Sequence, residues 1–295
     1  MPRLKHLPYG VGPPPADPWA CGTMTGMPVS PERIALISDV HGNLTALEAV
    51  LADIDARGIA RIFNLGDYVG KGHRGREVIE ICQERCEVNI LGNWDDFLPH
   101  PGREFDSAAL QWWLGQLAPG QGDWLRGLPF AHDFRMSGRQ IRLMHASAET
   151  VHRRVRYVHD ETEFLGQFQN TSATGNGPVP DVVGYADTHD PFYETQLRGR
   201  TLFNTGSVGN CMGDPTPLYC ILEGVVDGAE PAPFSISFVR VPYDVEAELA
   251  HAREVGAPEY DGYESELRRG IYRGSMAEYA DDAALDTYYH DVLVR

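Results

Sequence analysis

Three short apolar segments, each followed by a polar loop and an amphipathic stretch, constrain the fold of this chain more than any other feature. The segments cover residues 33–38, 62–65 and 87–91, and each is short enough to be a buried strand. Apolar residues recur at helical spacing over residues 43–57 and again around residues 77–84. Alternating strands and helices predict a largely parallel sheet with right-handed crossover connections.

The three predicted strands end in side chains that can bind a metal ion. In chain order these side chains are Asp39, His41, Asp67 and Asn93. Ligands of parallel sheets bind at the carboxyl ends of the strands. Residues two positions apart in a strand point to the same side, so we expect Asp39 and His41 to reach one cation. Taken alone, this Asp-x-His pair fits a polar loop and a metal site equally well.

Similar strand-end clusters recur later in the chain. Further strands are predicted at residues 130–136, 140–144, 180–184, 217–223 and 234–241. His145 follows the second of these strands, and Asp187 and His189 follow the third. Together with the segment that begins at Thr201, the last two strands are expected to complete a second sheet.

Tryptophan residues gather in residues 106–127, which are predicted to be helical. Trp112, Trp113 and Trp124 could form a stacking platform for a base, but packing in the core or in a lid is the favoured interpretation. A charged stretch at residues 159–168 is also predicted to be helical.

The composition limits the partners and the location of the chain. Its 42 acidic residues outnumber its 25 basic residues and give a net charge of −17, so we expect no binding of polymeric nucleic acid. No run of about 18 apolar residues occurs and no signal peptide is evident, so a cytoplasmic protein that does not bind membranes is expected. The five cysteines do not complete a zinc site and are expected to be reduced thiols.

The chain is predicted to contain one large domain with two extensions. Residues 1–30 are rich in proline and glycine and predict a flexible leader. Residues 31–243 contain all the strand-end motifs and form the main domain. Residues 244–295 are expected to pack on the same domain, as two helices within residues 244–272 followed by an acidic tail.

The order of the strand-end motifs resembles a known family. The motifs are Asp39-x-His41, Gly66-Asp67-x-x-Gly70, Gly92-Asn93-x-Asp95, His145 and Asp187-Thr-His189. They resemble the calcineurin-like metallophosphoesterase superfamily, and residues 204–209 resemble its bacterial YfcE-like, or diadenosine-tetraphosphatase-related, branch. The resemblance covers residues 33–243. It implies an α/β (α+β) fold, a four-layer αββα sandwich of two mixed β-sheets flanked by helices, with two divalent metal ions as cofactor.

The resemblance also implies which residues hold the first metal. Asp39, His41 and His189 would be its ligands, and Asp67 would bridge the two metals. Two close cations need a bridging carboxylate and a mixture of oxygen and nitrogen ligands. A hydroxide shared by the metals would attack phosphorus in line with the leaving group, and no phosphoenzyme is needed.

The second metal would be held by Asn93, His145 and Asp187. Asp187 stands where the family's Gly-His-Thr-His motif has its first histidine. An added carboxylate favours harder metals, so manganese or iron is expected, with zinc, nickel or cobalt as the alternatives. The alternative is that the side chain of Asp187 is too short to reach the metal.

The other departure from the family is Trp94, which replaces a histidine that contacts the phosphate and helps to protonate the leaving group. Indole cannot donate a proton in that sense. His73 is a candidate replacement for this histidine. The alternative is that His73 is simply an exposed histidine of the loop. The predicted catalytic residues are Asp67, Asn93 and His73. The predicted substrate contacts are Asn43, Lys71, Arg74 and Trp94.

These features predict a metal-dependent phosphohydrolase that acts on a small phosphodiester or nucleotide. Phosphomonoesterase or dinucleoside-polyphosphate hydrolase activity is the alternative among enzymes. From a different class, a degenerate protein that binds metal or phosphate with little turnover stays open because of Trp94 and Asp187. The oligomeric state is also left open, a homo-oligomer included.

Overall fold

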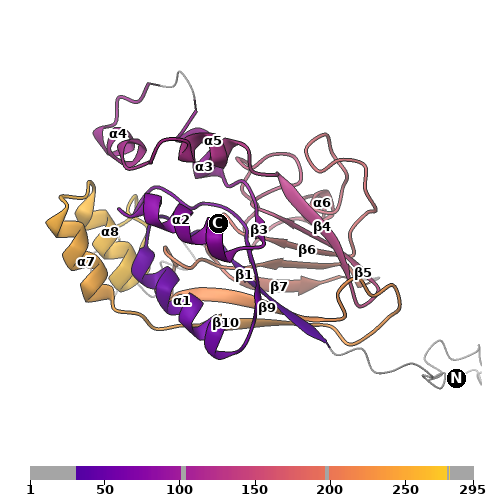
Figure 1. Cartoon of the computed structure of the whole chain (residues 1–295). Helices are drawn as coiled ribbons and strands as arrows, with labels where there is room; N and C mark the ends of the chain where they lie inside the picture. Colours follow the sequence, from indigo (N-terminus) through magenta and orange to yellow (C-terminus); the bar gives the residue numbers. More distant parts are fainter. Residues whose placement is uncertain (1–30, 101–103, 197–198, 278, 280–295) are drawn as a thin grey trace, which may run out of the picture. The chain divides into compact units, whose positions relative to one another are not determined.

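The computed structural model describes residues 31–100, 104–196, 199–277 and 279, and it contains two β-sheets flanked by helices (Figure 1). The strands are β1 (Glu32–Ile37), β2 (Arg61–Asn64), β3 (Val88–Asn89), β4 (Ala131–Met136), β5 (Arg139–Met144), β6 (Val182–Tyr185), β7 (Phe192–Thr195), β8 (Thr201–Asn204), β9 (Leu218–Gly224) and β10 (Ser235–Arg240). The helices are α1 (Leu44–Ala56), α2 (Gly75–Arg85), α3 (Asn93–Phe97), α4 (Ala108–Gly115), α5 (Gln121–Arg126), α6 (Glu161–Gly166), α7 (Val245–Glu254) and α8 (Tyr260–Arg269).

Each sheet has five strands and mixes parallel with antiparallel pairs. The first sheet has the order β10-β9-β1-β2-β3, in which β1, β2 and β3 are parallel and β9 is antiparallel to both of its neighbours. The second has the order β4-β5-β6-β8-β7, in which β5, β6 and β8 are parallel and the two edge strands are antiparallel. This confirms the predicted fold of two mixed sheets flanked by helices.

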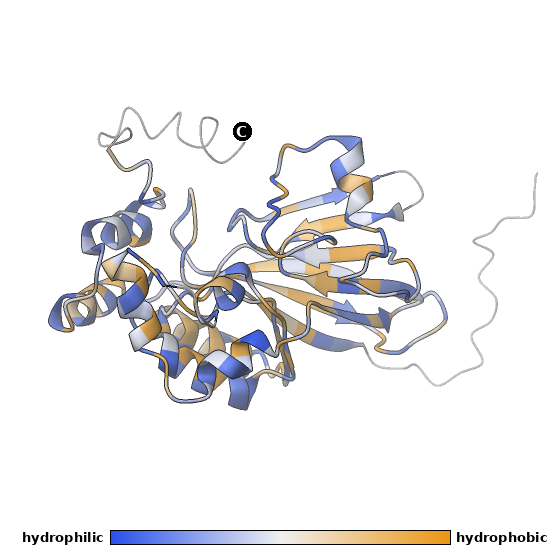
Figure 2. Ribbon diagram, turned by 90° about the horizontal axis from the view of Figure 1, so that it is seen from above, coloured by the Kyte–Doolittle hydropathy of each residue, from blue (hydrophilic) through white to orange (hydrophobic). Residues whose placement is uncertain are grey.

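Apolar residues of the strands build cores on both faces of each sheet. Leu36 of β1 packs with Phe203 of β8 in a core between the two sheets. The next residue, Ile37, belongs instead to the core beneath α1 and α2. On the far face of the second sheet, Phe164 of α6 packs with Val183 of β6. Figure 2 shows apolar residues along the strands of both sheets. The layers therefore run helix, sheet, sheet, helix.

Two features of the sheets differ from the prediction. The segments near 217–223 and 234–241 are predicted to join the second sheet, but they form β9 and β10 of the first. β9 pairs with the edge of β1 that β2 leaves free, where Leu36 lies opposite Cys220. An apolar pattern shows which face of a strand is buried but not which strand lies beside it. The edge strand β7 is not predicted, and only Phe192 of its four residues is buried.

The ends of α1, by contrast, follow from the local sequence. Asn43 caps the helix because its side chain accepts a hydrogen bond from the backbone nitrogen of Ala46 at 3.1 Å. Gly58 lies just beyond the helix with a φ of 66°, a left-handed conformation that glycine adopts without strain. These two residues place the helix as predicted.

The tryptophan-rich segment forms α4 and α5 and packs on the core beside the first sheet. Trp113 is 3% exposed, and its ring centroid lies 5.6 Å from that of Trp94. Trp112 and Trp124 are partly buried against the same core. These contacts support core packing rather than a stacking platform for a base.

Two helices, α7 and α8, lie within the predicted residues 244–272, and Figure 1 shows α7 beside α1. Thr45 of α1 donates a hydrogen bond to the buried Glu248 of α7 at 2.6 Å. The predicted leader and most of the acidic tail lie outside the described residues, and the domain boundaries stay predictions. None of the helices in the described residues is long and apolar enough to cross a membrane. The free thiols among the described residues, all buried, are Cys82, Cys86, Cys211 and Cys220.

Candidate metal centre

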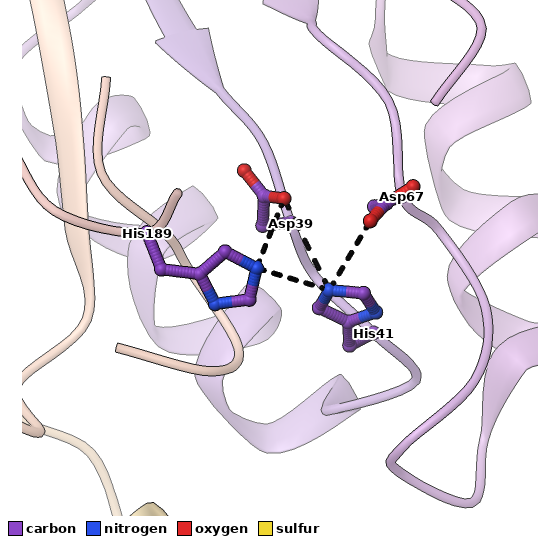
Figure 3. A group of neighbouring side chains, drawn as sticks. All are labelled: Asp39, His41, Asp67 and His189. Atoms are coloured by element: carbon purple, nitrogen blue, oxygen red, sulfur yellow. Dashed lines mark hydrogen bonds and ion pairs between the residues drawn. The ribbon is translucent and has the colours of Figure 1, made fainter. Parts of the chain in front are cut away.

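The predicted metal ligands lie in loops at the carboxyl ends of parallel strands from both sheets. Asp39 and His41 follow β1, and Asp67 follows β2. His145 follows β5 in the second sheet, and His189 follows β6. Ligand atoms of Asp39, His41, Asp67 and His189 lie within 4.8 Å of one another, and this buried group could hold a metal ion (Figure 3).

A left-handed backbone conformation is common to most of these residues. Nine non-glycine residues of the described chain have a positive φ. Five of them are predicted ligands with φ between 48° and 62°, namely Asp39, His41, Asp67, Asp187 and His189. Such a conformation is uncommon and collects at functional sites, where the surrounding structure holds it in place.

This conformation corrects the expected geometry of the first motif. β1 ends at Ile37, so Asp39 and His41 do not alternate along an extended strand. They converge because the loop turns at both positions, with φ values of 50° and 48°. The predicted convergence is present, but a loop produces it.

One group of ligand atoms, called site 1, contains Asp39, His41 and His189 with Oδ2 of Asp67. Nε2 of His41 lies 3.3 Å from Oδ2 of Asp67, and Nε2 of His189 lies 3.2 Å from Oδ1 of Asp39. Neither carboxylate oxygen of Asp39 accepts a hydrogen bond from a described residue, although both are buried. Buried carboxylate oxygens of this kind need a cation or a donor.

The two imidazoles of site 1 point their lone pairs at each other. Nδ1 of His41 lies 3.1 Å from the carbonyl oxygen of Val69, and Nδ1 of His189 contacts that of Asn210. A carbonyl only accepts, so both Nδ1 atoms carry the proton and both Nε2 atoms are unprotonated in the neutral rings. These Nε2 atoms lie 3.3 Å apart. A cation between them would remove the repulsion, and this tautomer is typical of metal-binding histidine.

The remaining predicted ligands, Asn93, His145 and Asp187, together with Oδ1 of Asp67, are called site 2. Nδ1 of His145 lies 2.7 Å from the carbonyl oxygen of Leu65, and its Nε2 lies 3.5 Å from Oδ1 of Asp67. Nε2 of His145 and Oδ1 of Asn93 are buried and have no hydrogen-bond partner among the described residues. The two oxygens of Asp67 thus lie near different histidines, Oδ2 near His41 and Oδ1 near His145. Oδ1 also accepts a hydrogen bond from the backbone nitrogen of Trp94 at 2.9 Å.

Asp187 is buried in site 2 with both oxygens engaged. Asn93 donates to its Oδ1 at 3.0 Å. Arg154 donates to Oδ2 at 3.1 Å and to Oδ1 at 3.2 Å. Its role as a metal ligand stays a prediction. Arg154, which the sequence patterns do not single out, is brought to the centre by this carboxylate.

Charges in the centre shift the pKa of several groups. Burial raises the pKa of Asp67 to about 7, although His145 opposes the shift. Burial disfavours the charged form of His145, but Asp67 and Asp39 together raise its pKa to about 9. Burial lowers the pKa of His41 well below its usual value, and the charge of Lys71 adds to this effect. His41 is therefore neutral, as a metal ligand must be.

Asp95 holds the loop of Asp67 in place, a role that the sequence patterns miss. One of its oxygens accepts hydrogen bonds from the backbone nitrogens of Asp67 at 2.7 Å and Gly92 at 2.9 Å. The other accepts one from Tyr68 at 3.0 Å. A Cβ on Gly92 would lie 2.3 Å from the backbone nitrogen of Asp67, so only glycine allows this close approach. The Gly-Asn-x-Asp spacing is the signal for this function.

His73 and Arg74 are directed away from the candidate centre. Nε2 of His73 lies 2.8 Å from Nδ1 of His251, and its Nδ1 lies 3.5 Å from Oε1 of Glu248. Arg74 forms an ion pair with the same Glu248 and donates to Thr45. These contacts tie the loop after β2 to α7. They do not bring His73 to the ligand group, because the side chains that its ring contacts, His251 and Glu248, lie on α7.

Asn43, Lys71 and Trp94 lie closer to the centre, in different ways. Asn43 is fully buried and, besides capping α1, donates to the carbonyl oxygen of Gly209 at 3.0 Å. Nζ of Lys71 donates to Asn210 at 2.8 Å, and burial lowers its pKa to about 8 although nearby carboxylates oppose this. The ring of Trp94 meets that of His41 edge-on at 5.7 Å. Their predicted contacts with substrate stay predictions.

Comparison with known proteins agrees with this geometry. A family model described as a calcineurin-like phosphoesterase superfamily domain matches residues 33–225. An uncharacterized protein of Methanocaldococcus jannaschii is 27% identical over 242 residues, which cover 78% of this chain and 95% of that protein.

Solved structures give the same result. The crystal structure of a metallophosphoesterase from Sphaerobacter thermophilus is 27% identical with a TM-score of 0.63, and the match covers 81% of this chain and 99% of that chain. A hypothetical protein from Pyrococcus horikoshii, 19% identical with a TM-score of 0.65 and the same coverage, shares the fold. The family model spans most of the described domain, and the chain therefore belongs to the calcineurin-like phosphoesterase superfamily.

Proposed function

We propose that the protein is a phosphohydrolase that uses two divalent metal ions to hydrolyse a small phosphate ester or nucleotide. The superfamily uses divalent metals, and site 1 could bind one. The observation that carries the proposal of two metals is the position of Asp67. Its Oδ2 lies 3.3 Å from His41 and its Oδ1 lies 3.5 Å from His145, so one carboxylate lies beside a predicted ligand of each site, which supports a bridging role.

The donor atoms support a metal at each site. Site 1 offers two unprotonated imidazole nitrogens and the partnerless carboxylate of Asp39. Site 2 offers the partnerless Nε2 of His145 and Oδ1 of Asn93, with Asp187 beside them. Oxygen and imidazole ligands without thiolate suit manganese or iron, and they also accept zinc, nickel or cobalt.

The residues of the centre would fix the ligands before substrate binds. The carbonyl oxygens of Leu65, Val69 and Asn210 accept hydrogen bonds from Nδ1 of three imidazoles, so Nε2 of each ring is the atom available to a metal. His145, whose pKa is about 9, would release its Nε2 proton when a metal binds. Asp95 holds the loop from which Asp67 reaches both sites. Divalent cations at this position would neutralise the oxygens of the phosphoryl group and lower the pKa of the attacking water.

Trp94 affects the choice of leaving group. A histidine at this position would help to protonate the departing oxygen, a contribution of roughly 10²–10⁴-fold. Trp94 cannot donate a proton in that sense, and His73 is engaged by α7. We therefore expect esters with acidic leaving groups, such as aryl or phosphate groups, to react much faster than alkyl esters.

Metal analysis coupled to an activity assay tests the proposal. The purified chain, incubated with Mn²⁺ and then freed of excess metal, is expected to retain two metal ions and to hydrolyse p-nitrophenyl phosphate or its bis ester. Two bound metals without hydrolysis of any mono- or diester would instead identify a binding protein. A single bound metal would contradict the bridging role of Asp67.

A further inference from the structure

Arg154 is held at the edge of site 2 by a buried carboxylate. Its Nε and Nη2 donate to the two oxygens of Asp187 at 3.1 and 3.2 Å. This side-on pairing fixes the plane of the guanidinium. Asp187 is 3% exposed, whereas the side chain of Arg154 is 50% exposed. Arg154 therefore pairs with a buried carboxylate of the centre while half of its own side chain is exposed to solvent.

The fixed guanidinium has donors left over. Arginine carries five N–H groups, and Asp187 accepts two of them. Within the described part of the chain, Nη1 donates no hydrogen bond to another residue. The edge formed by Nη1 and the second N–H of Nη2 can donate charge-assisted hydrogen bonds to a phosphate oxygen. Asp187 does not occupy this edge, and half of the surface of the side chain is exposed.

The same carboxylate links Arg154 to the ligand atoms of site 2. Asn93 donates to Oδ1 of Asp187 at 3.0 Å and has its own Oδ1 without a partner. Burial disfavours the charge of Arg154, but Asp187 and, more weakly, Asp67 raise its pKa. Arg154 is thus permanently charged and within electrostatic range of the bridging carboxylate.

We propose that Arg154 binds a non-bridging oxygen of the substrate phosphate and makes the enzyme prefer phosphomonoesters, including terminal phosphates of nucleotides, over phosphodiesters. The proposal rests on the proposed function. A monoester has three non-bridging oxygens and a diester has two. When the two sites beside Asp67 engage one oxygen each, only the monoester keeps a third oxygen for Arg154. Asp187 acts as the positioning residue that holds the guanidinium.

The test compares Arg154→Gln with Arg153→Gln in the full chain loaded with Mn²⁺. Arg153 is a matched control because it is 46% exposed and pairs with Glu149 at 2.7 Å. We expect Arg154→Gln to lower kcat/KM for p-nitrophenyl phosphate by about 10- to 100-fold, mainly through KM, since a charge-assisted hydrogen bond is lost. The value for bis-p-nitrophenyl phosphate is expected to change by less than about threefold, and Arg153→Gln is expected to change neither.

A binding measurement provides a readout that does not depend on turnover. Titration calorimetry is expected to show that the wild type binds inorganic phosphate more tightly than dimethyl phosphate, and that Arg154→Gln reduces this preference by about the same 10- to 100-fold. Bound metal, measured by elemental analysis, is expected to stay unchanged. Arg154→Lys keeps the charge but not the planar donor pair, so an intermediate preference is expected.

Two results would overturn the proposal. An equal loss of kcat/KM for both esters, or loss of bound metal in Arg154→Gln, would assign Arg154 to the support of Asp187 alone. An unchanged ratio between the esters together with an unchanged phosphate preference would show that Arg154 does not contact substrate. If the wild type hydrolyses neither ester, the proposed function fails, and the phosphate titration by itself decides the role of Arg154.

Discussion

Sites 1 and 2 share Asp67, but their surroundings differ. In site 1, His41 and His189 present two imidazole nitrogens 3.3 Å apart, and both residues are buried. In site 2, one imidazole is joined by an amide and by Asp187, whose ion pair with Arg154 leads to the surface. We therefore expect the buried site 1 to hold a cation firmly and site 2 to meet the substrate.

The C-terminal helices strengthen this difference. The carbonyl oxygen of Asn210 contacts His189 of site 1, and the side chain of Asn210 donates to Glu266 of α8 at 2.9 Å. Glu266 is fully buried and paired with Arg273 at 2.7 Å. The family model ends at residue 225, so α8 lies beyond it and still supports a ligand of site 1. We therefore expect the metal of site 1 to be bound more tightly than that of site 2.

The largest effect is expected for Asp67→Asn, which removes the carboxylate that the two sites share. The amide keeps the shape but lacks the charge that two cations need, so both metals should be lost and activity should fall by at least about 10³-fold. Elemental analysis and the ester assay measure the two effects. Retention of one tightly bound metal would show that Asp67 does not bridge.

The next test separates the sites by removing one imidazole from each. His145→Gln is expected to keep one metal, bound at site 1, whereas His41→Gln is expected to weaken the metal at site 1. Activity should fall by about 10²-fold or more in both, because each variant loses part of the charge that stabilises the transition state. Titration with Mn²⁺ gives the affinities. If the His145→Gln and His41→Gln variants each bind their remaining metal ion with the same affinity for Mn²⁺, the expected difference between the two sites is contradicted.

A smaller effect is expected for Glu266→Gln on α8. Removing this support of Asn210 and His189 should weaken the metal at site 1 by about 10- to 100-fold. It should also destabilise the fold by up to roughly 3 kcal/mol, because the largely buried Arg273 would keep only Glu259, whose side chain is 47% exposed, as its ion-pair partner. Glu264→Gln, on the exposed face of the same helix, is a suitable control. An unchanged metal affinity would show that α8 supports the fold alone.

The same carboxylate predicts a pH dependence. Burial would raise the pKa of Glu266, but Arg273 lowers it below its usual value of 4.5. A carboxylate with a lowered folded pKa adds stability above its unfolded pKa and loses it as pH falls through the folded pKa. The difference in Tm between wild type and Glu266→Gln should therefore be large at neutral pH and shrink below pH 4.5. A difference independent of pH would exclude this linkage.

The smallest effect is expected for Asn43→Ala, in the loop that carries His41. The helix cap of α1 and a hydrogen bond to Gly209 would be lost, at a cost of about 1–2 kcal/mol in stability. Metal content and KM should stay unchanged, because the side chain is fully buried among protein partners. Thermal unfolding and the ester assay test this. A rise in KM without loss of stability would restore Asn43 as a substrate contact.

Much of the candidate centre could be predicted because its signals are local. The polar residues after β1, β2 and β6 stand at strand ends, and parallel strands bring such ends to one edge of a sheet. The cap of α1 at Asn43 and its end at Gly58 depend on residues within one turn of the helix. The order of the motifs was also sufficient to indicate the superfamily.

Other features depend on segments far apart in the chain, and no local pattern contains them. β9 joins β1 across more than half of the described chain, so its sheet could not be read from its own residues. His73 contacts His251 of α7, and Arg154 is fixed by Asp187. The sequence determined which residues could bind metal, because residue type and strand ends are local properties. Only the tertiary structure decided which of them meet, because charge pairing and burial depend on neighbours that folding brings together.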